Sequence, residues 1–493
     1  MSGTQQREHR PEAPGLSRLR RKVTGLAVAG ALGGFLFGFD SSVVNGAVDA
    51  IGKDFKLSPT LQGFAVAIAL LGCALGAYLA GRVADRIGRT RTMLVGAILF
   101  LVSSIGAGLA FGVVDFMVWR VIGGLGIGVA SVVAPTYIAE VVPANVRGRL
   151  GSLQQLAITL GIFAALLSDA LFAGFNGKTG ASQHLLFGLE AWRWMFLVGV
   201  IPSLLWGVIA LRLPESPRHL LAKQDEQGAR SVLQQTTPAD DIDGEVGDIQ
   251  DSIKEDEENA RKATLRGPVL GLQPVVWAGI VLSVLQQFVG INVIFYYSTT
   301  LWNAVGFKDS FLISVISSVI NLAVTFVAIA FVDKLGRRPM LLAGSIGMTV
   351  SLAFVAIAFS QAHTVHGTPS LPSPWGLIAL VAANVFVISF GATWGPLIWV
   401  LLGEMFPNRI RAKALGVAAA GQWLANFAVT LTFPPLADVS LVLTYGLYAA
   451  FALVSLVFVY FVVPETKGVR LEEMGGLAFG RKARAAQKAA AAR

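Results

Sequence analysis

The stretch GRVADRIGR, Gly81 to Arg89, places an aspartate among arginines between two long apolar runs. It returns later in the chain as FVDKLGRR, Phe331 to Arg338. Two other motifs recur in the same order, namely AEVVPANVRGR (139–149) as GEMFPNRIRAK (403–413), and PES (214–216) as PET (464–466). Three ordered matches indicate that the chain consists of two related halves.

The runs between these motifs are apolar and long. Hydrophobic residues make up 54% of the chain and charged residues only 14%, whereas about 25% of residues are charged in soluble domains. No charged residue lies between Lys56 and Arg82, or between Asp309 and Asp333. Such runs are close to the roughly 20 residues that a helix needs to cross hydrocarbon. Counting them predicts twelve membrane-spanning helices, six in each half.

Basic clusters fall on alternate loops, as in RLRRK (18–22), NVRGR (145–149) and NRIRAK (408–413). The positive-inside rule places these loops in the cytoplasm. The net charge of +9 therefore reflects topology, and we expect no nucleic-acid partner. The sequence predicts a multi-pass protein of the cell membrane with both termini cytoplasmic.

A charged segment between Pro214 and Arg266 interrupts the apolar runs and divides the chain. We expect an all-α membrane protein with two six-helix bundles and a cytoplasmic helical linker. The expected parts are a cytoplasmic tail (1–22), an N-terminal bundle (23–213), a linker with short helices (214–271), a C-terminal bundle (272–463) and a second cytoplasmic tail (464–493).

Some of the 54 glycines stand four residues apart, such as Gly72 with Gly76 and Gly124 with Gly128. Small residues at this spacing allow membrane helices to approach closely. The stretch GGLGIG (123–128) superficially resembles a phosphate loop, but it lacks the GxGxxG spacing and a preceding strand. We therefore interpret these glycines as packing positions.

The recurring loops carry acids and arginines at the expected helix ends. Arginine can hold carboxylates with two hydrogen bonds, so we expect salt bridges that latch the cytoplasmic ends together. The alternative is that the basic residues only anchor the topology, but anchoring requires no acid in register. The predicted gate residues are Asp85, Arg89, Glu140, Arg147, Glu215, Asp333, Arg337, Glu404, Arg411 and Glu465.

Three charged residues lie inside predicted spans, where each costs about 2.5–3.5 kcal/mol unless paired or hydrated. Asp40 lies nine residues before Asp49, and Arg120 lies five after Asp115, so both fall in the outer half of the membrane at comparable depth. Such a pair could load or release a proton when the arginine moves, and the alternative is a static ion pair. Asp169 is expected to be a solvated residue near the outer surface.

Amides and aromatic residues also gather within the later spans. The set comprises Gln155, Gln286, Gln287, Asn292, Tyr296, Asn321, Trp394, Trp399, Gln422, Trp423 and Asn426. Amides donate to and accept from hydroxyl groups, and a tryptophan face suits the C–H face of a sugar ring, so an uncharged polyol fits. Such residues could instead join helices by hydrogen bonds. Three amides close together on one span exceed that need.

Several stretches together resemble the signatures of the sugar porter family of the major facilitator superfamily. Among them are GFLFGFD (34–40), WRVIGGLGIGVAS (119–131), PESPRHL (214–220), QQFVGINVIFYYS (286–298) and WGPLIWVLLGEMFP (394–407), and the resemblance runs from about Leu26 to Gly468. It implies a two-bundle monosaccharide carrier that works by alternating access. The implied sugar-binding positions are Phe37, Gln155, Gln286, Gln287, Asn292, Tyr296, Asn321, Gly395, Trp399, Gln422 and Trp423.

The same resemblance bears on energy coupling and on the sugar. Asp40 and Arg120 match the positions that proton-coupled members use, whereas many facilitative members have a neutral residue in place of the aspartate. Ile162 replaces a glutamine of some pentose-handling relatives, which favours glucose, and Thr90 departs from a usually basic position, although Arg91 follows. We therefore expect a proton-coupled importer of a monosaccharide, with glucose favoured.

Three alternatives remain open: an uncoupled sugar uniporter, a sugar sensor and a proton-driven drug antiporter. An enzyme is not expected, because the sequence contains no HExxH, GxSxG or phosphate-loop motif. We expect no cofactor and no metal site, since none of the five histidines lies inside a span. The expected partners are a monosaccharide, a proton and the lipid bilayer, and the expected working unit is a monomer.

Overall fold

The chain forms a helical membrane protein, as predicted. The computed structural model describes residues 14–142, 144–175, 180–237, 241–262, 264–304, 307, 309–365, 368–407 and 410–466. Within these ranges, twelve helices or helix combinations are long and apolar enough to cross a membrane. The predicted number of spans is therefore confirmed.

The first half contains six spans, five of them single helices. They are α1 (Pro14–Asp54), α2 (Pro59–Ile87), α3 (Arg89–Gly108), α4 (Val113–Val141), α5 (Ala144–Gly174), and a sixth span made of α6 (Ala191–Leu197) and α7 (Val200–Arg212). Ser58 begins α2 by accepting a hydrogen bond from the Leu61 amide, and Pro59 follows at the first helical position, where proline lacks only an amide that would be unpaired anyway.

The second half repeats this order but breaks two of its spans. Its helices are α11 (Pro274–Phe288), α12 (Ile291–Tyr296), α13 (Ser298–Ala304), α14 (Ser310–Leu335), α15 (Arg337–Phe359), α16 (Trp375–Ser389), α17 (Gly395–Met405), α18 (Arg411–Val439) and α19 (Leu441–Phe461). Gly290, with φ 82°, separates α11 from α12. A π-helical turn, Phe390–Trp394, joins α16 to α17. Such π turns often lie at functional sites.

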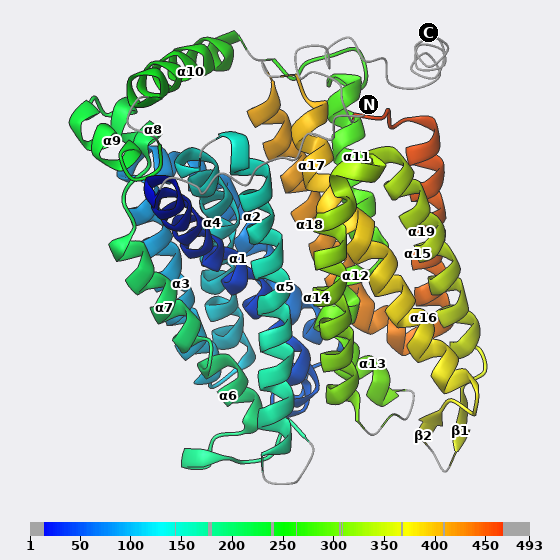
Figure 1. Ribbon diagram of the computed structural model, residues 1–493. Helices are drawn as coiled ribbons and strands as arrows, with labels where there is room; N and C mark the ends of the chain where they lie inside the picture. The colour runs from blue at the N-terminus through cyan, green and yellow to red at the C-terminus, as the bar shows by residue number, and fades with distance from the viewer. Residues whose placement is uncertain are drawn as a thin grey trace, which may run out of the picture.

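Short elements mark the two ends of the molecule. The linker forms α8 (Pro217–Ala222), α9 (Glu226–Leu233) and α10 (Ile242–Lys262), and the polar loop before α16 forms a hairpin of β1 (His363–Val365) and β2 (Thr368–Ser370). Figure 1 shows the linker helices at one end and the hairpin at the other. We call these the linker end and the hairpin end.

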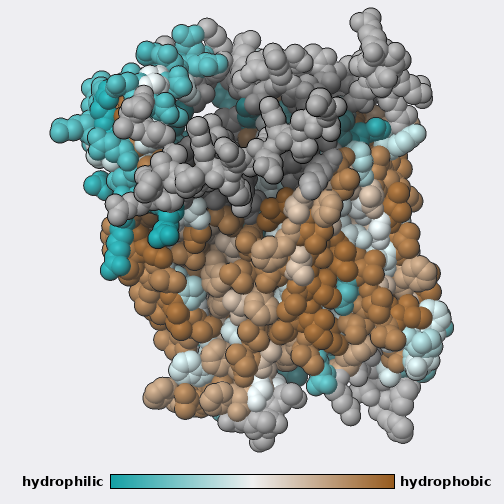
Figure 2. All heavy atoms as spheres, viewed as in Figure 1, coloured by the Kyte–Doolittle hydropathy of each residue, from teal (hydrophilic) through white to brown (hydrophobic). Residues whose placement is uncertain are grey.

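Helix boundaries mark the ends of the two halves. The last helix of the first half ends at Arg212, and the first helix of the second half begins at Pro274. Figure 2 shows apolar side chains over the middle of the molecule, with hydrophilic ones gathered at the linker end. We keep the five-part division as a proposal, because its outer parts extend beyond the described residues.

The predicted glycine packing is found where α2 crosses α4. A Cβ added to Gly124 would lie 2.0 Å from the carbonyl oxygen of Ala69, and one added to Gly72 would lie 2.4 Å from that of Val121. A Cβ added to Gly76 or to Gly128 would lie similarly close to a carbonyl oxygen of the other helix. Because real Cβ atoms do not approach this closely, only glycine allows the two helices to pack here.

We expect Gly124→Ala to destabilise the protein by about 1–3 kcal/mol, because its methyl group would overlap the α2 backbone. Gly81→Ala is the control, since a Cβ at Gly81 meets nothing within 4 Å and alanine favours a helix by up to about 1 kcal/mol over glycine. Thermal unfolding of both variants in detergent measures the difference. Equal midpoints would contradict the packing role.

Candidate functional site

Asp40 of α1 and Arg120 of α4 form a buried ion pair. The Arg120 Nη1 atom donates to Asp40 Oδ1 at 2.8 Å. Arg120 is 2% exposed and Asp40 is 4% exposed. The predicted pairing is therefore present. Asp40 Oδ2 and Arg120 Nε have no hydrogen-bond partner among the described residues. The pair thus retains one acceptor and one donor for water or for another arrangement of the helices.

A small cavity lies beside this ion pair and is shared by both halves. Its lining residues are Phe37, Asp40, Ser41, Val44, Val66, Ala69, Leu70, Cys73, Arg120, Ile127 and Tyr296. All except Tyr296 come from the first half. Tyr296 ends α12 and is 5% exposed. Two residues predicted to bind sugar, Phe37 and Tyr296, therefore line the cavity beside the predicted proton pair.

The three predicted amides of the seventh span are connected in series. Gln286 Nε2 donates to the carbonyl oxygen of Trp394 at 2.9 Å, which ties α11 to the π-helical turn. Gln287 Nε2 donates to Gln286 Oε1 at 3.3 Å, and Asn292 Nδ2 donates to Gln287 Oε1 at 2.5 Å. This network holds the amides around the break at Gly290.

An aromatic contact joins the two halves. The rings of Phe37 and Trp423 meet edge to face, with centroids 5.6 Å apart. Asn321 of α14 is buried, and a Cβ built on Gly391 of the π-helical turn would lie 3.1 Å from its Oδ1. Phe37 and Trp423 are thus brought together across the two halves, while Asn321 lies at the π-helical turn.

The remaining predicted sugar-binding positions lie on α5, α17 and α18. Gln155 on α5 and Gln422 on α18 are half-buried, and Gln422 Oε1 has no hydrogen-bond partner among the described residues. Gly395 begins α17, and its carbonyl oxygen lies 3.4 Å from Gln286 Nε2. Trp399 is 43% exposed. Whether these residues contact a sugar stays a prediction.

The sequence reasoning missed a polar latch at the hairpin end. Asn45 of α1 accepts from the Thr299 amide at 3.0 Å and donates to Ser298 Oγ at 2.8 Å. Asp49, one turn further on, accepts from Thr300 Oγ1 at 2.7 Å. These contacts bind α1 to α13 and so join the two halves. The available signal was the pair of polar residues four apart at the end of an apolar run.

At the linker end, the first half carries a charged cluster at the start of α3. Arg89 Nε and Nη2 donate to the two carboxylate oxygens of Glu140, both at 2.9 Å. Arg89 also pairs with Asp85 at 3.1 Å, and its backbone amide donates to Glu215 at 2.8 Å. Thr90, at the position that departs from the family pattern, donates its hydroxyl to Glu215 at 2.9 Å.

The second half repeats the arginine–glutamate pair and the backbone-amide contacts of this cluster. Arg337 Nη2 and Nε donate to the carboxylate of Glu404 at 2.8 and 3.2 Å. The amides of Arg337 and Arg338 both donate to Glu465 at 3.0 Å. The glycines that precede the two arginines, Gly88 and Gly336, have φ of 97° and 90°, values that favour glycine. The inferred repeat is thus present as matching geometry.

These clusters join helices within a half. Arg411 Nε donates to the carbonyl oxygen of Phe406 at 3.2 Å, and the side chains of Arg147 and Asp333 lie outside the description. His219 Nδ1 lies 3.4 Å from Arg89 Nη1. Burial lowers the pKa of His219, so a neutral ring can accept from the arginine. A latch between the two halves stays a prediction.

The prediction for Asp169 was wrong. We expected a solvated residue near a helix end, but Asp169 is only 1% exposed. The Gly46 amide donates to its Oδ2 at 3.1 Å. Helical rise gives only the distance of this residue along its own helix, and it carries no information on which neighbouring helix covers the side chain.

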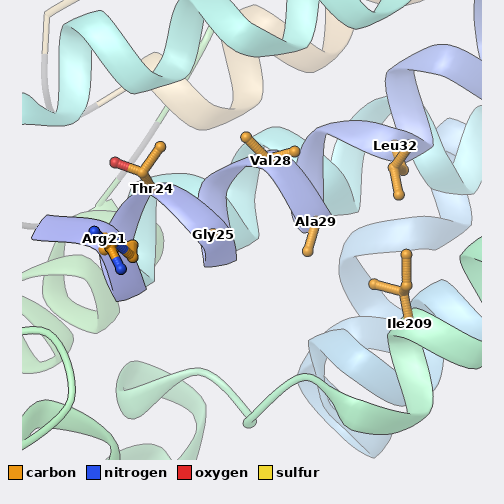
Figure 3. A pocket seen from close by; sticks show the side chains of 7 residues that line it. All are labelled: Arg21, Thr24, Gly25, Val28, Ala29, Leu32 and Ile209. Carbon is orange, nitrogen blue, oxygen red and sulfur yellow. The ribbon is translucent and has the colours of Figure 1, made fainter. Parts of the chain in front are cut away.

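A separate groove of about 620 Å³ runs along the flank of the first half, between α1 and α7. It is lined by Arg21, Thr24, Gly25, Val28, Ala29, Leu32 and Ile209 (Figure 3). Figure 3 shows mostly aliphatic side chains around it, with Arg21 and Thr24 as the polar ones. These residues offer few hydroxyl partners, so the groove is not the candidate polyol site.

Two six-helix halves, a polar network at a broken span and a buried ion pair between helices define a membrane carrier. Comparison with known proteins specifies its class. The family model described as "Sugar (and other) transporter" matches residues 26–477. The chain therefore belongs to the sugar transporter family of the major facilitator superfamily, and it is a transporter rather than an enzyme.

Individual relatives cover nearly the whole chain. A glucose transport protein of Synechocystis sp. is 54% identical over 455 residues, which is 92% of this chain and 96% of that protein. The D-xylose-proton symporter of Escherichia coli K12 is 35% identical over 491 residues, 92% and 95% of the two chains. A solved structure of the Escherichia coli xylose transporter in its inward open conformation superposes with a TM-score of 0.77 at 34% identity, covering 92% of this chain and 99% of that one.

We expect Arg120→Gln to destabilise the protein by about 3–5 kcal/mol, because it leaves Asp40 buried without its cation. Adding Asp40→Asn should recover much of this loss, since an amide pair carries no charge. Arg230→Gln is the control, because its pairs with Glu226 and Asp243 lie on the surface, where water screens the charges and such pairs contribute little to stability. Thermal unfolding compares the variants. A loss for Arg120→Gln no larger than the control would contradict the argument.

Proposed function

We propose that this transporter imports a monosaccharide, with glucose favoured, in symport with a proton. The observation that carries the proposal is the cavity in which Asp40 and Arg120 meet Phe37 and Tyr296. The candidate proton-binding group and two residues of the candidate sugar site line one small cavity there. Binding of the sugar can therefore change the affinity for the proton, and the reverse, through direct contacts rather than a long-range pathway.

The sugar would bind between the halves, near the break at Gly290. Gln286, Gln287 and Asn292 provide amides that can pair with sugar hydroxyls, and Trp423 meets Phe37 there. Binding would exchange Gln287–Asn292 hydrogen bonds for bonds to hydroxyl groups. The glucose assignment is supported by the name of the Synechocystis relative and by Ile162.

Asp40 would carry the proton. When Arg120 lies beside it, as here, the ionised carboxylate is balanced by a cation. If a conformational change draws the arginine away, the carboxylate loses its partner in a low-dielectric site, and protonation becomes the less costly state. Proton binding and helix movement are then linked. The proton-coupled xylose relative supports this reading.

We infer that the structure is in the inward-facing form. The hairpin end is held closed by Asn45 and Thr299, whereas the charged clusters around Arg89 and Arg337 join helices within their own halves. Similarity to the inward open xylose transporter supports this inference. Alternating access then requires the α1–α13 contacts to open and contacts at the linker end to form.

We also propose that the linker end faces the cytoplasm. The basic loop motifs are the support, because positive loops stay inside. The protein would lie in the cell membrane, with both chain termini on its cytoplasmic side. A monomer suffices for this mechanism, since both halves that enclose the site belong to one chain, and lipid surrounds its apolar belt.

Gln287→Ala should weaken glucose binding by about 1–3 kcal/mol, because sugar hydroxyls lose their partner. Gln273→Ala is the matched control, since Gln273 precedes α11 and donates to Thr264 instead. Equilibrium binding to purified protein compares both variants with the wild type. If glucose binds Gln287→Ala as tightly as it binds the control, Gln287 does not belong to the site.

Uptake of radiolabelled glucose into proteoliposomes, with and without an inward proton gradient, tests coupling. We expect the gradient to drive accumulation by the wild type but not by Asp40→Asn, because an amide cannot take up a proton. The variant should still exchange glucose across the membrane. If neither protein accumulates glucose but both equilibrate it, the transporter is a uniporter and the Asp40–Arg120 pair is static. If neither moves glucose, the assignment of glucose as the substrate is contradicted.

A further inference from the structure

The first half contains a second buried carboxyl group that the proposed mechanism does not use. Asp169 of α5 is 1% exposed, and its only described hydrogen bond comes from the Gly46 amide of α1, at 3.1 Å to Oδ2. Its other oxygen, Oδ1, has no hydrogen-bond partner among the described residues. This environment contrasts with that of Asp40, which has an arginine at 2.8 Å.

The carboxyl group fits a space that glycine creates. A Cβ added to Gly46 would lie 2.7 Å from both the Cβ and the Cγ of Asp169. Any larger residue would push α5 away from α1, so the side chain rests directly on the helix backbone. This contact excludes water from that side of the carboxyl group.

No cation balances Asp169 in the described part of the chain. The elements packed against α5 include α1, α4, α6 and α14. Arg120 of α4 pairs with Asp40, and Arg193 of α6 pairs with Asp54 and Glu190. Lys53, in the last turn of α1, is exposed.

The remaining acids of these helices have other positions. On α1, Asp49 accepts from Thr300, and on α4, Asp115 accepts from the Trp119 indole. Asp309 immediately precedes α14, and the Asp333 and Lys334 side chains of α14 are outside the description. An ionised carboxylate beside Gly46 would have one hydrogen bond and no counter-charge, and burying such a group is costly.

The location of Asp169 connects it to opening of the hairpin end. Gly46 lies six residues beyond Asp40 on α1, about 9 Å closer to the hairpin end at 1.5 Å per residue. Its immediate neighbour Asn45 makes the latch to Thr299 and Ser298. Separation of α1 from α13 would bring water to this stretch of α1 before it reaches Asp40.

We propose that Asp169 is a second proton-binding site of this transporter, neutral while the hairpin end is closed and in exchange with external water when it opens. The inference rests on the proposed proton-coupled function, which it extends. On opening, Oδ1 gives its proton to water and leaves a carboxylate; before closure, it takes a proton back. Closure of the hairpin end therefore requires a proton on Asp169 as well as a bound sugar.

Infrared spectroscopy of the reconstituted protein at neutral pH tests the site without any transport. A neutral carboxyl group has a C=O stretch separate from the carboxylate bands, and it shifts in heavy water. We expect this band in the wild type and in Asp40→Asn, and its loss in Asp169→Asn, whose amide resembles the neutral acid and can still accept from Gly46. Asp169→Ser repeats the subtraction if the amide variant does not fold.

Absence of the band in the wild type, or its persistence in both Asp169 variants, would overturn the proposal. The band does not depend on proton-driven accumulation of glucose. A failure of the proposed function can therefore be distinguished from a failure of this proposal. As a second readout, glucose exchange without a proton gradient should slow in the wild type as external pH rises, because ionised Asp169 opposes closure. Asp169→Asn should lose this part of the pH dependence, and an unchanged profile would contradict the exchange with external water.

Discussion

A charged or polar group that lies inside this helical bundle must find its partner within the protein, because hydrocarbon supplies none. The Asp40–Arg120 pair is the direct expression of that constraint. It holds α1 and α4 together, and it does so with only one of the two carboxylate oxygens engaged. An ion pair with unused hydrogen-bonding atoms is easier to rearrange than a fully hydrogen-bonded one. It therefore suits helices whose arrangement has to change during transport.

The internal repeat extends from sequence motifs to individual hydrogen bonds. Arg89 with Glu140 and Arg337 with Glu404 are equivalent pairs, and each arginine follows a glycine with positive φ. Because the two clusters lie at the same end of the molecule, each half has its own rigid support there. The halves can therefore move as units, as alternating access requires.

Contacts between the halves are of different kinds at different levels. Near the middle, Phe37 meets Trp423, and Tyr296 lines the cavity beside the ion pair. Toward the hairpin end, hydrogen bonds of Asn45 with Thr299 and Ser298 join the halves. The interruption at Gly290 separates α12 and α13 from α11, so this segment lies next to both the candidate sugar site and the hairpin-end contacts of Asn45. In the proposed mechanism, sugar binding and helix movement would thus involve the same few residues.

The sequence by itself determined the number of spans, the repeat and the resemblance to sugar porters, because hydrophobic length and motif order are properties of the chain alone. It also indicated the partner of Asp40, since two opposite charges at equal depth in hydrocarbon have few alternatives. It could not indicate that Asp169 is buried or that Asn45 meets Thr299. Spacing along a helix fixes the depth of a residue, but only the packing of helices decides which neighbour it faces and whether water reaches it.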